Sequence, residues 1–185
     1  MKRYFGRIAV LLAVSVIGLT GCQGGPSVDG LIRGDIAAEF DAVKADDPEF
    51  AEDIKKAAGD DLAMYGIDPE AFTEAYLEGF DYEVDGVDVD DEAGTAVAHV
   101  TMTCKSMDAI MADFQEKFEE KVQSVDIGKL TEDDFYKLGG EVMMACIEGA
   151  EPRDAEIDLK YAEGDRGEWS IDDSAEEAIA AAMMG

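Results

Sequence analysis

The spacing of apolar residues changes along this chain, and the change limits the folds that are open to it. Between residues 82 and 104 apolar and polar side chains alternate, a period of two that is typical of strands with one buried face. Before and after this stretch apolar residues recur every three or four positions, as they do in amphipathic helices. Residues 82–90 and 95–104 therefore predict a hairpin, joined by the sequence DEAG and preceded and followed by helices.

Helices are predicted on both sides of this hairpin. Residues 32–43 form the first, and two more begin after Asp47 and Asp68, each an aspartate that can cap a helix and each followed by a proline. Beyond the hairpin, one helix begins after Ser106 and another at Thr131. A glycine pair in the last of these, at 139–140, costs about 1 kcal/mol per glycine relative to alanine and marks either a close crossing or a break.

A second hairpin and a terminal helix complete the predicted order. Residues 155–162 alternate between core and water, the sequence EGDRG turns the chain, and Trp169 returns it on the core side. Ser174 and Glu177 form a predicted capping box for an alanine-rich helix, as Thr131 does with Asp134 in the helix before. Antiparallel hairpins with helices gathered on one side indicate a single α+β domain, here over residues 31–185.

Two stretches carry a resemblance to a known family. DYEVDGVDVDDEAGTAVAHVTM resembles the first hairpin, and YAEGDRGEWSID the closing strands, of small bacterial lipoproteins with a nuclear-transport-factor-two-like fold. The resemblance covers residues 70–175. It implies a curved antiparallel sheet packed by helices, nuclear-transport-factor-two-like or cystatin-like. Because that fold hosts enzymes, binders and structural modules alike, it implies no single function.

The first 22 residues are typical of an export signal. A basic start precedes an apolar run at 8–18 that is shorter than the roughly 20 residues needed to span a bilayer. The motif Leu19-Thr20-Gly21-Cys22 resembles the lipobox of bacterial lipoproteins. That resemblance implies a thioether-linked diacylglycerol on Cys22, which would become the mature N-terminus.

The lipobox divides the chain and predicts its location. Residues 1–21 are a lipoprotein signal peptide, and 22–30 are a flexible tether rich in glycine. Two acyl chains suffice for stable anchoring, so the domain is expected on the extracytoplasmic side of a cell membrane, held by the lipid on Cys22. An ordinary secretory peptide, in which Cys22 is incidental, is the alternative. The type of cell envelope stays open.

Acidic residues dominate the composition. The chain has 15 Lys and Arg against 44 Asp and Glu, and three of the basic residues lie in 1–21. Residues 22–185 therefore carry 12 basic against 44 acidic residues, a net charge of −32. Such a surface repels nucleic acid and anionic headgroups, which argues against a nucleic-acid partner. It attracts cations, basic peptides or divalent metals, although solubility alone also accounts for it.

Besides Cys22 the chain contains Cys104 and Cys146. Both lie on the apolar side of a predicted strand or helix, and an even pair in an exported protein can form a disulfide. Two buried free thiols are the alternative, which the sequence leaves open. No CxxC is present and there is one histidine, so a zinc site is not predicted.

The stretch at 81–92 has the spacing of a calcium-binding loop. Asp81, Glu83 and Asp85 occupy positions one, three and five, with Gly86 sixth and Glu92 twelfth. An EF-hand loop should lead into a helix, however, and the residues that follow alternate like a strand. The side-chain parity also slips by one residue near Gly86, as in a β-bulge. The favoured interpretation is a bulged hairpin, with a metal site as the alternative.

His99 is the only histidine and lies on the more polar face of its predicted strand. In a pocket against the sheet it could act as a general acid–base with a carboxylate, but a surface histidine is the favoured interpretation. The sequence contains no GxSxG, HExxH, phosphate-binding glycine loop or dinucleotide fingerprint. No catalytic residue is therefore assigned, and no cofactor is predicted.

Three functions remain open. The favoured one is a non-catalytic, lipid-anchored domain that binds an unknown protein or small ligand. The alternatives are an enzyme that uses His99 in a sheet pocket, and a divalent-cation binder that uses residues 81–92.

Overall fold

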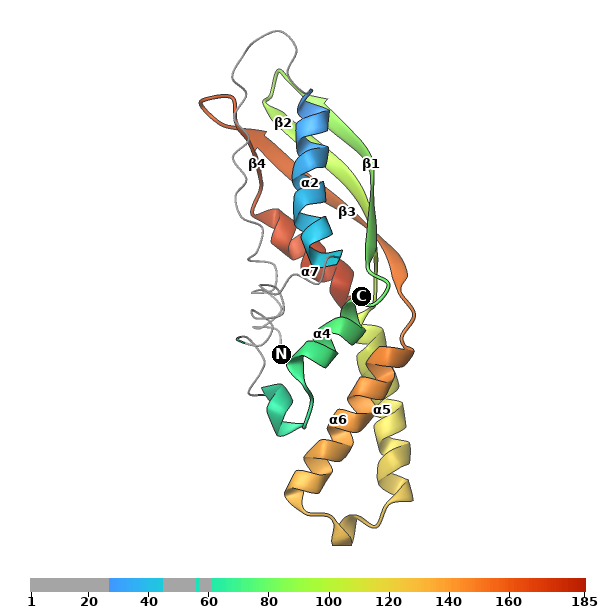
Figure 1. The fold of residues 1–185 in the computed structure, drawn as a ribbon. Coiled ribbons are helices and arrows are strands. Elements are labelled where there is room, and N and C mark those ends of the chain that lie inside the picture. The colour runs from blue at the N-terminus through green and yellow to red at the C-terminus, as the bar shows by residue number, and fades with distance from the viewer. Residues whose placement is uncertain (1–26, 45–55, 57–60) are drawn as a thin grey trace.

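The structure, a computed structural model, describes residues 27–44, 56 and 61–185. The predicted signal peptide, Cys22 and most of the helix predicted after Asp47 lie outside these residues. Within them the order of elements is the predicted one: helices, a hairpin, two helices, a hairpin and a final helix. The α+β class is confirmed, with an open antiparallel sheet and helices packed on it (Figure 1).

One antiparallel sheet runs in the order β1-β2-β3-β4. Its strands are β1 Asp81–Asp90, β2 Thr95–Cys104, β3 Arg153–Glu163 and β4 Trp169–Ile171. β2 pairs with β3 over its whole length and with β1 from Thr95 to Thr103, whereas β4 pairs only with residues 161–163 of β3. Along the rest of β3, from 153 to 160, no strand of the described chain lies on the side opposite β2.

The β1–β2 hairpin contains the predicted bulge. Its register shifts between Val84 and Gly86, so that Tyr82 and Val84 before the shift face the helices together with Val87 and Val89 after it. Without the extra residue, one half of the strand would turn its valines to water. At the turn, the Asp90 carboxylate accepts hydrogen bonds from the backbone amides of Glu92 and Ala93, and Gly94 has a positive φ of 62°.

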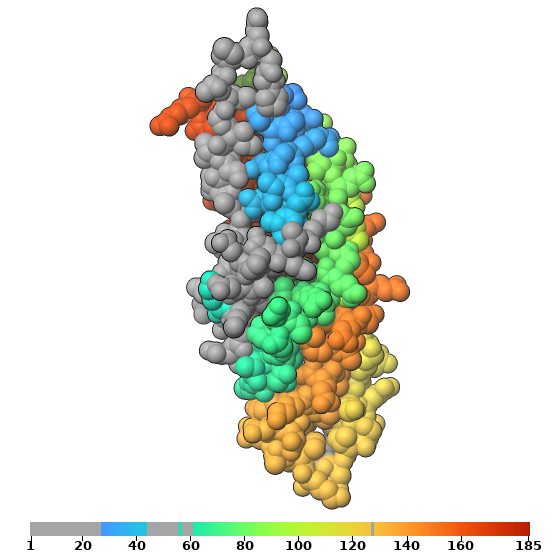
Figure 2. All heavy atoms as spheres, in the orientation of Figure 1, coloured from blue at the N-terminus to red at the C-terminus, as the bar shows by residue number. Residues whose placement is uncertain are grey.

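The helices lie on the buried face of the sheet and beyond one end of it. They are α2 Val28–Lys44, α4 Pro69–Leu77, α5 Met107–Ser124, α6 Glu132–Gly149 and α7 Ser174–Met184. α2 and α7 lie against the sheet, while α5 and α6 run side by side away from it (Figure 1). Figure 2 shows this helical pair as the lower end of an elongated molecule.

Capping confirms one sequence prediction and corrects another. Thr131 and Asp134 form the predicted reciprocal capping box at the start of α6. The box predicted for Ser174 and Glu177 is wrong, because the backbone amide of Ser174 donates to the Asp172 carboxylate at 2.9 Å instead. An aspartate two residues upstream in the turn offers a shorter local route to that amide than a capping box does.

The glycine pair in α6 marks a close crossing, not a break, because α6 continues through it. A Cβ atom on Gly140 would overlap the backbone carbonyl of Tyr65, and one on Gly139 would touch the rings of Tyr65 and Phe118. The segment that leads into α4 therefore lies directly on α6. Only a residue without a side chain allows this approach.

Lys105 connects the ends of two helices from inside the protein. Its side chain is 2% exposed, and its ammonium donates to the carbonyls of Ala75 at 2.8 Å and Ile147 at 3.0 Å. These carbonyls belong to the last turns of α4 and α6, where the helix dipole favours a cation, and the Ile147 carbonyl also accepts from the Ala150 amide at 3.3 Å. Glu78 Oε2 lies 3.4 Å away and supplies a counter-charge.

The last turn of α7 is tied to the rest of the domain by side-chain donors. Three consecutive carbonyls accept them: Ala182 from Arg153 (3.1 Å) and Cys104 (3.6 Å), Met183 from Tyr76 (3.1 Å), and Met184 from Ser106 (3.1 Å). The donors come from β3, β2, α4 and the segment that follows β2, so α7 closes the core from four sides.

Candidate functional site

The outer face of the sheet is strongly acidic. Alternation along β1 and β3 turns one carboxylate after another to solvent, and every one of these side chains is exposed: Asp81, Glu83, Asp85, Asp88, Asp90, Asp154, Glu156 and Asp158. β2 lies between the two strands and contributes hydroxyls. Thr101 donates to Asp85 and Thr103 to Asp154, each at 2.8 Å.

The calcium loop considered for residues 81–92 is a hairpin. Asp81, Glu83 and Asp85 are spaced along one extended strand, and Glu92 lies in the turn beyond its end. Extended residues two apart are separated by about 6.5 Å, so these carboxylates do not converge on one point. Among the described residues, no group of three or more Asp, Glu, His or Cys could hold a metal ion.

His99 lies on this outer face and not in a pocket against the buried face. Its Nδ1 is 2.7 Å from Asp158 Oδ1 and its Nε2 is 3.2 Å from Asp88 Oδ2, and 44% of its side chain is exposed. The hydrogen bond with Asp158, and secondly that with Asp88, raise the pKa of His99 above the ordinary 6.5. Both ring nitrogens are thus engaged by carboxylates, which favours an imidazolium that bridges three strands.

The disulfide considered for Cys104 and Cys146 is not formed. Both are free, buried thiols, and Cys104 uses its thiol to donate to the Ala182 carbonyl. Burial raises the pKa of both thiols, and a hydrogen bond with Asp113 raises that of Cys146 further. Their raised pKa values and their burial suit packing more than nucleophilic chemistry.

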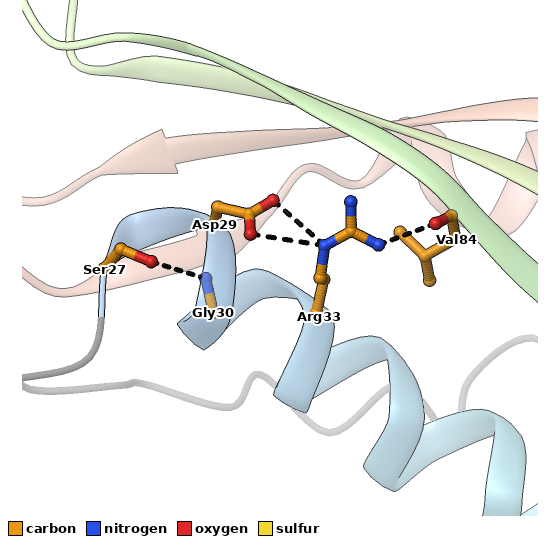
Figure 3. Close-up of polar contacts among 5 residues, drawn as sticks. All are labelled: Ser27, Asp29, Gly30, Arg33 and Val84. Carbon is orange, nitrogen blue, oxygen red and sulfur yellow. Dashed lines mark hydrogen bonds and ion pairs between the residues drawn. The ribbon is translucent and has the colours of Figure 1, made fainter.

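The β1 edge of the sheet is blocked by side chains. The Arg33 guanidinium of α2 donates to the Val84 carbonyl at 2.6 Å, and its Nε lies 3.0 Å from Asp29 Oδ2 (Figure 3). The bulge at Asp85 bends the strand at the same point. A bulge and a charged side chain on an edge are two of the ways in which proteins prevent a further strand from pairing there.

The edge of β3 has no bulge along its pairing with β2, although the side chains of Arg153 and Lys160 line the space beside it. The Lys160 carbonyl accepts from the Asp172 amide at 2.7 Å, on the side away from β2. In an antiparallel strand alternate residues direct both backbone groups to the same side. The amides and carbonyls of Asp154, Glu156 and Asp158 therefore also point away from β2, toward the side that has no strand.

A groove of about 700 Å³ lies between this edge and α7. This size falls within the roughly 300–1,000 Å³ of typical ligand pockets. Its strand wall includes Glu156, Ile157 and Asp158, and its helix wall presents small side chains, among them Ala178 and Ala181. The groove is wide open to solvent. Its lining combines the carboxylates of Glu156, Asp158 and Glu177 with the cations of Arg153 and Lys160 and with alanine methyl groups, a combination suited to binding.

The sequence predicted the strand and the helix that form this groove, but it did not predict that they would lie beside each other. The alternation at 155–162 predicted a strand and the alanine-rich end predicted a helix. That β4 would pair with only three residues of β3, and so leave an edge open beside α7, depends on where the turn after residue 163 places the chain. His99 lies outside the lining of the groove, although its partner Asp158 belongs to it.

No helix among the described residues is long and apolar enough to cross a bilayer.

Comparisons with known proteins find little kinship. No family model matches the chain, and no curated protein matches it. Among solved structures, one similar chain comes from the "Crystal structure of a putative lipoprotein (ycdA) from Bacillus subtilis subsp. subtilis str. 168", with a TM-score of 0.43 and 13% sequence identity. The alignment covers 74% of this chain and 45% of that chain, so the match spans less than half of the Bacillus protein.

Proposed function

We propose that this chain is a lipid-anchored binding protein on the extracytoplasmic side of a cell membrane, and that the groove between β3 and α7 is its binding site. The observation that carries the proposal is the motif Leu19-Thr20-Gly21-Cys22 after a basic and apolar leader. A diacylated Cys22 would hold the domain at the membrane surface. The predicted tether of residues 22–30 is shorter than expected, because α2 already begins at Val28. The glycine-rich residues between Cys22 and α2 would leave the groove free to meet a ligand.

The chemistry of the groove supports binding without catalysis. Its lining offers carboxylates, the cations of Arg153 and Lys160, and methyl groups beside the backbone of β3, which can orient and hold a ligand. The histidine lies outside it, paired on both nitrogens, and the two buried thiols have raised pKa values. The high negative charge would draw cationic ligands toward the surface before they dock.

The anchor is tested by expressing the full chain in a bacterium and measuring the mass of the processed protein by mass spectrometry. We expect an N-terminal peptide that begins at Cys22 and carries a diacylglycerol, and we expect the protein in the membrane fraction. Cys22→Ser should abolish both the lipid mass and the membrane association. Cys146→Ser, which changes a cysteine that is buried in the fold, should leave them unchanged.

A soluble, secreted product with an unmodified Cys22 would refute the anchor. Detergent extraction with and without a wash at high salt would separate lipid anchoring from charge-based adhesion, because salt screens charge and leaves acyl chains inserted.

A further inference from the structure

We propose that the open edge of β3 binds an extended polypeptide that adds to the sheet as a further strand, with basic residues on its outward face and small residues facing α7. The proposal rests on the proposed function, because it takes the β3–α7 groove as the binding site and names its occupant. It rests independently on backbone geometry, on the helix wall and on charge.

The backbone of β3 presents amides and carbonyls with which a partner strand could pair. Asp154, Glu156 and Asp158 direct their amides and carbonyls to the open side, as the bond from Asp172 to the Lys160 carbonyl indicates. Register along β2–β3 is regular over all ten pairs, without a bulge. An extended peptide of about five residues would match this length and satisfy these groups, as in β-strand addition.

The helix wall leaves room beside the edge. An added strand would turn alternate side chains toward α7, where Ala178, Ala181 and Ala182 line the groove. Methyl groups on the helix leave space for a second strand backbone and for small apolar side chains. Long residues at these positions would fill the same space, so the wall favours small inward residues.

Charge sets the other face of the peptide. Its outward side chains would lie beside the exposed Asp154, Glu156 and Asp158, and the Glu156 side chain has no hydrogen bond or ion pair within the described chain. The two cations of the groove lining, Arg153 and Lys160, flank this acidic stretch in the sequence of β3. Opposite charges on neighbouring strands stabilise a pair, and like charges destabilise it. Lysine or arginine at alternate positions therefore fits this edge.

The same charge argues against a second copy of this chain in the groove. Residues 22–185 carry a net charge of −32, so two copies repel each other. The β1 edge is not an equivalent site, because Arg33 already donates to the Val84 carbonyl and the bulge interrupts the strand next to it. The occupant is thus a separate, basic polypeptide segment.

Binding is measured with the full lipidated protein in non-ionic detergent micelles and a labelled probe of sequence KAKAKAK with blocked ends. We expect saturable binding by fluorescence anisotropy, weakened by about tenfold or more when the lysines are replaced by glutamates. Equal binding of the glutamate peptide, or no binding of either peptide, would overturn the proposal.

Two N-methylated probes test whether the peptide pairs as a strand. Methylating the lysine amides in one probe, and the alanine amides in the other, removes the donors of one set of alternate residues. Binding should be lost in one probe and retained in the other. In an antiparallel pair the peptide residues opposite Asp154, Glu156 and Asp158 form the hydrogen bonds, and these are the lysines, so loss with methylated lysines indicates an antiparallel strand. In a parallel pair the residues that flank them form the bonds, so loss with methylated alanines indicates a parallel strand. Loss in both or in neither contradicts strand addition.

Matched variants locate the site. Ala181→Trp should fill the groove and reduce probe binding by about tenfold or more, whereas Ala112→Trp, on the exposed side of α5, should not. Glu156→Lys should weaken binding more than Glu83→Lys, which makes the same charge change on β1. Circular dichroism melts check that each variant folds. Equal effects within either pair would overturn the assignment to β3.

Two further measurements separate this inference from the anchor and from a dimer. The mass of the N-terminal peptide and the membrane fraction are determined on the same preparation, so an unlipidated protein that binds the probe refutes only the anchor. A lipidated protein that ignores the probe refutes only strand addition. A dimer in sedimentation that Ala181→Trp abolishes, and that the probe dissociates, would place a second copy in the groove and overturn the proposal.

Discussion

Individual side chains link the strands of this acidic sheet, and His99 is the one that becomes a cation when it is protonated. It lies between Asp158 of β3 and Asp88 of β1, so protonation places a cation among carboxylates. A pKa that is raised in the folded state stabilises the fold below the unfolded pKa, near 6.5. This contribution is lost as the pH rises through the folded pKa.

The pKa of His99 should therefore exceed 6.5 when its ring protons are followed by NMR. Asp158→Asn should lower the pKa more than Asp88→Asn, because the hydrogen bond with Asp158 is the larger cause of the increase. His99→Gln should flatten the pH dependence of the melting temperature above pH 6. A pKa at or below 6.5 in the wild type would show that the two carboxylates do not hold the ring.

At Gly140 there is no room for one additional carbon atom, because the Tyr65 carbonyl lies directly against the helix. Gly140→Ala should lower the free energy of unfolding by about 2–3 kcal/mol, because the new methyl group meets the Tyr65 carbonyl and forces the segment away. Gly34→Ala is the control. It lies in the middle of α2 with open space around it and should stabilise the protein by up to about 1 kcal/mol. Urea denaturation measures both, and a neutral Gly140→Ala would exclude the close crossing.

Among the elements, the ends of α4 and α6 depend on Lys105. Lys105→Met keeps the length of the side chain but removes the ammonium, and we expect a loss of about 3 kcal/mol in unfolding free energy because buried carbonyls lose their donor. Lys129→Met is the control, since that lysine forms an exposed ion pair with Asp126 and should change stability by less than about 1 kcal/mol. Similar losses of unfolding free energy in both variants would show that the buried hydrogen bonds of Lys105 do not stabilise the fold.

Local pattern predicted the elements well, and long-range contacts account for what it missed. The parity slip at Gly86 predicted the bulge, and Thr131 with Asp134 predicted a real cap. These features involve neighbours in the sequence. Lys105 resembled any surface lysine, because its acceptors lie 30 and 42 residues away. The open edge of β3 was missed for the same reason, since it depends on how far β4 extends.

For the molecule as a whole, the central question about cations is whether they bind at a site or only screen charge. The carboxylates of 81–92 are spread along β1 and the turn that follows it, so calcium should act only by reducing self-repulsion. Millimolar calcium chloride and magnesium chloride should therefore raise the melting temperature equally. A larger effect of calcium that Glu92→Gln abolishes would revive the loop site.

The hydrogen bonds on the last turn of α7 bear on the order in which the domain folds. Donors from residues 76, 104, 106 and 153 all end on the carbonyls of 182–184, so the core closes only when the final turn docks. Contacts with such long sequence separation form late, after loop closure has been paid for in entropy. Docking of this turn is therefore expected to be a late step in folding, and the core should stay open until it occurs.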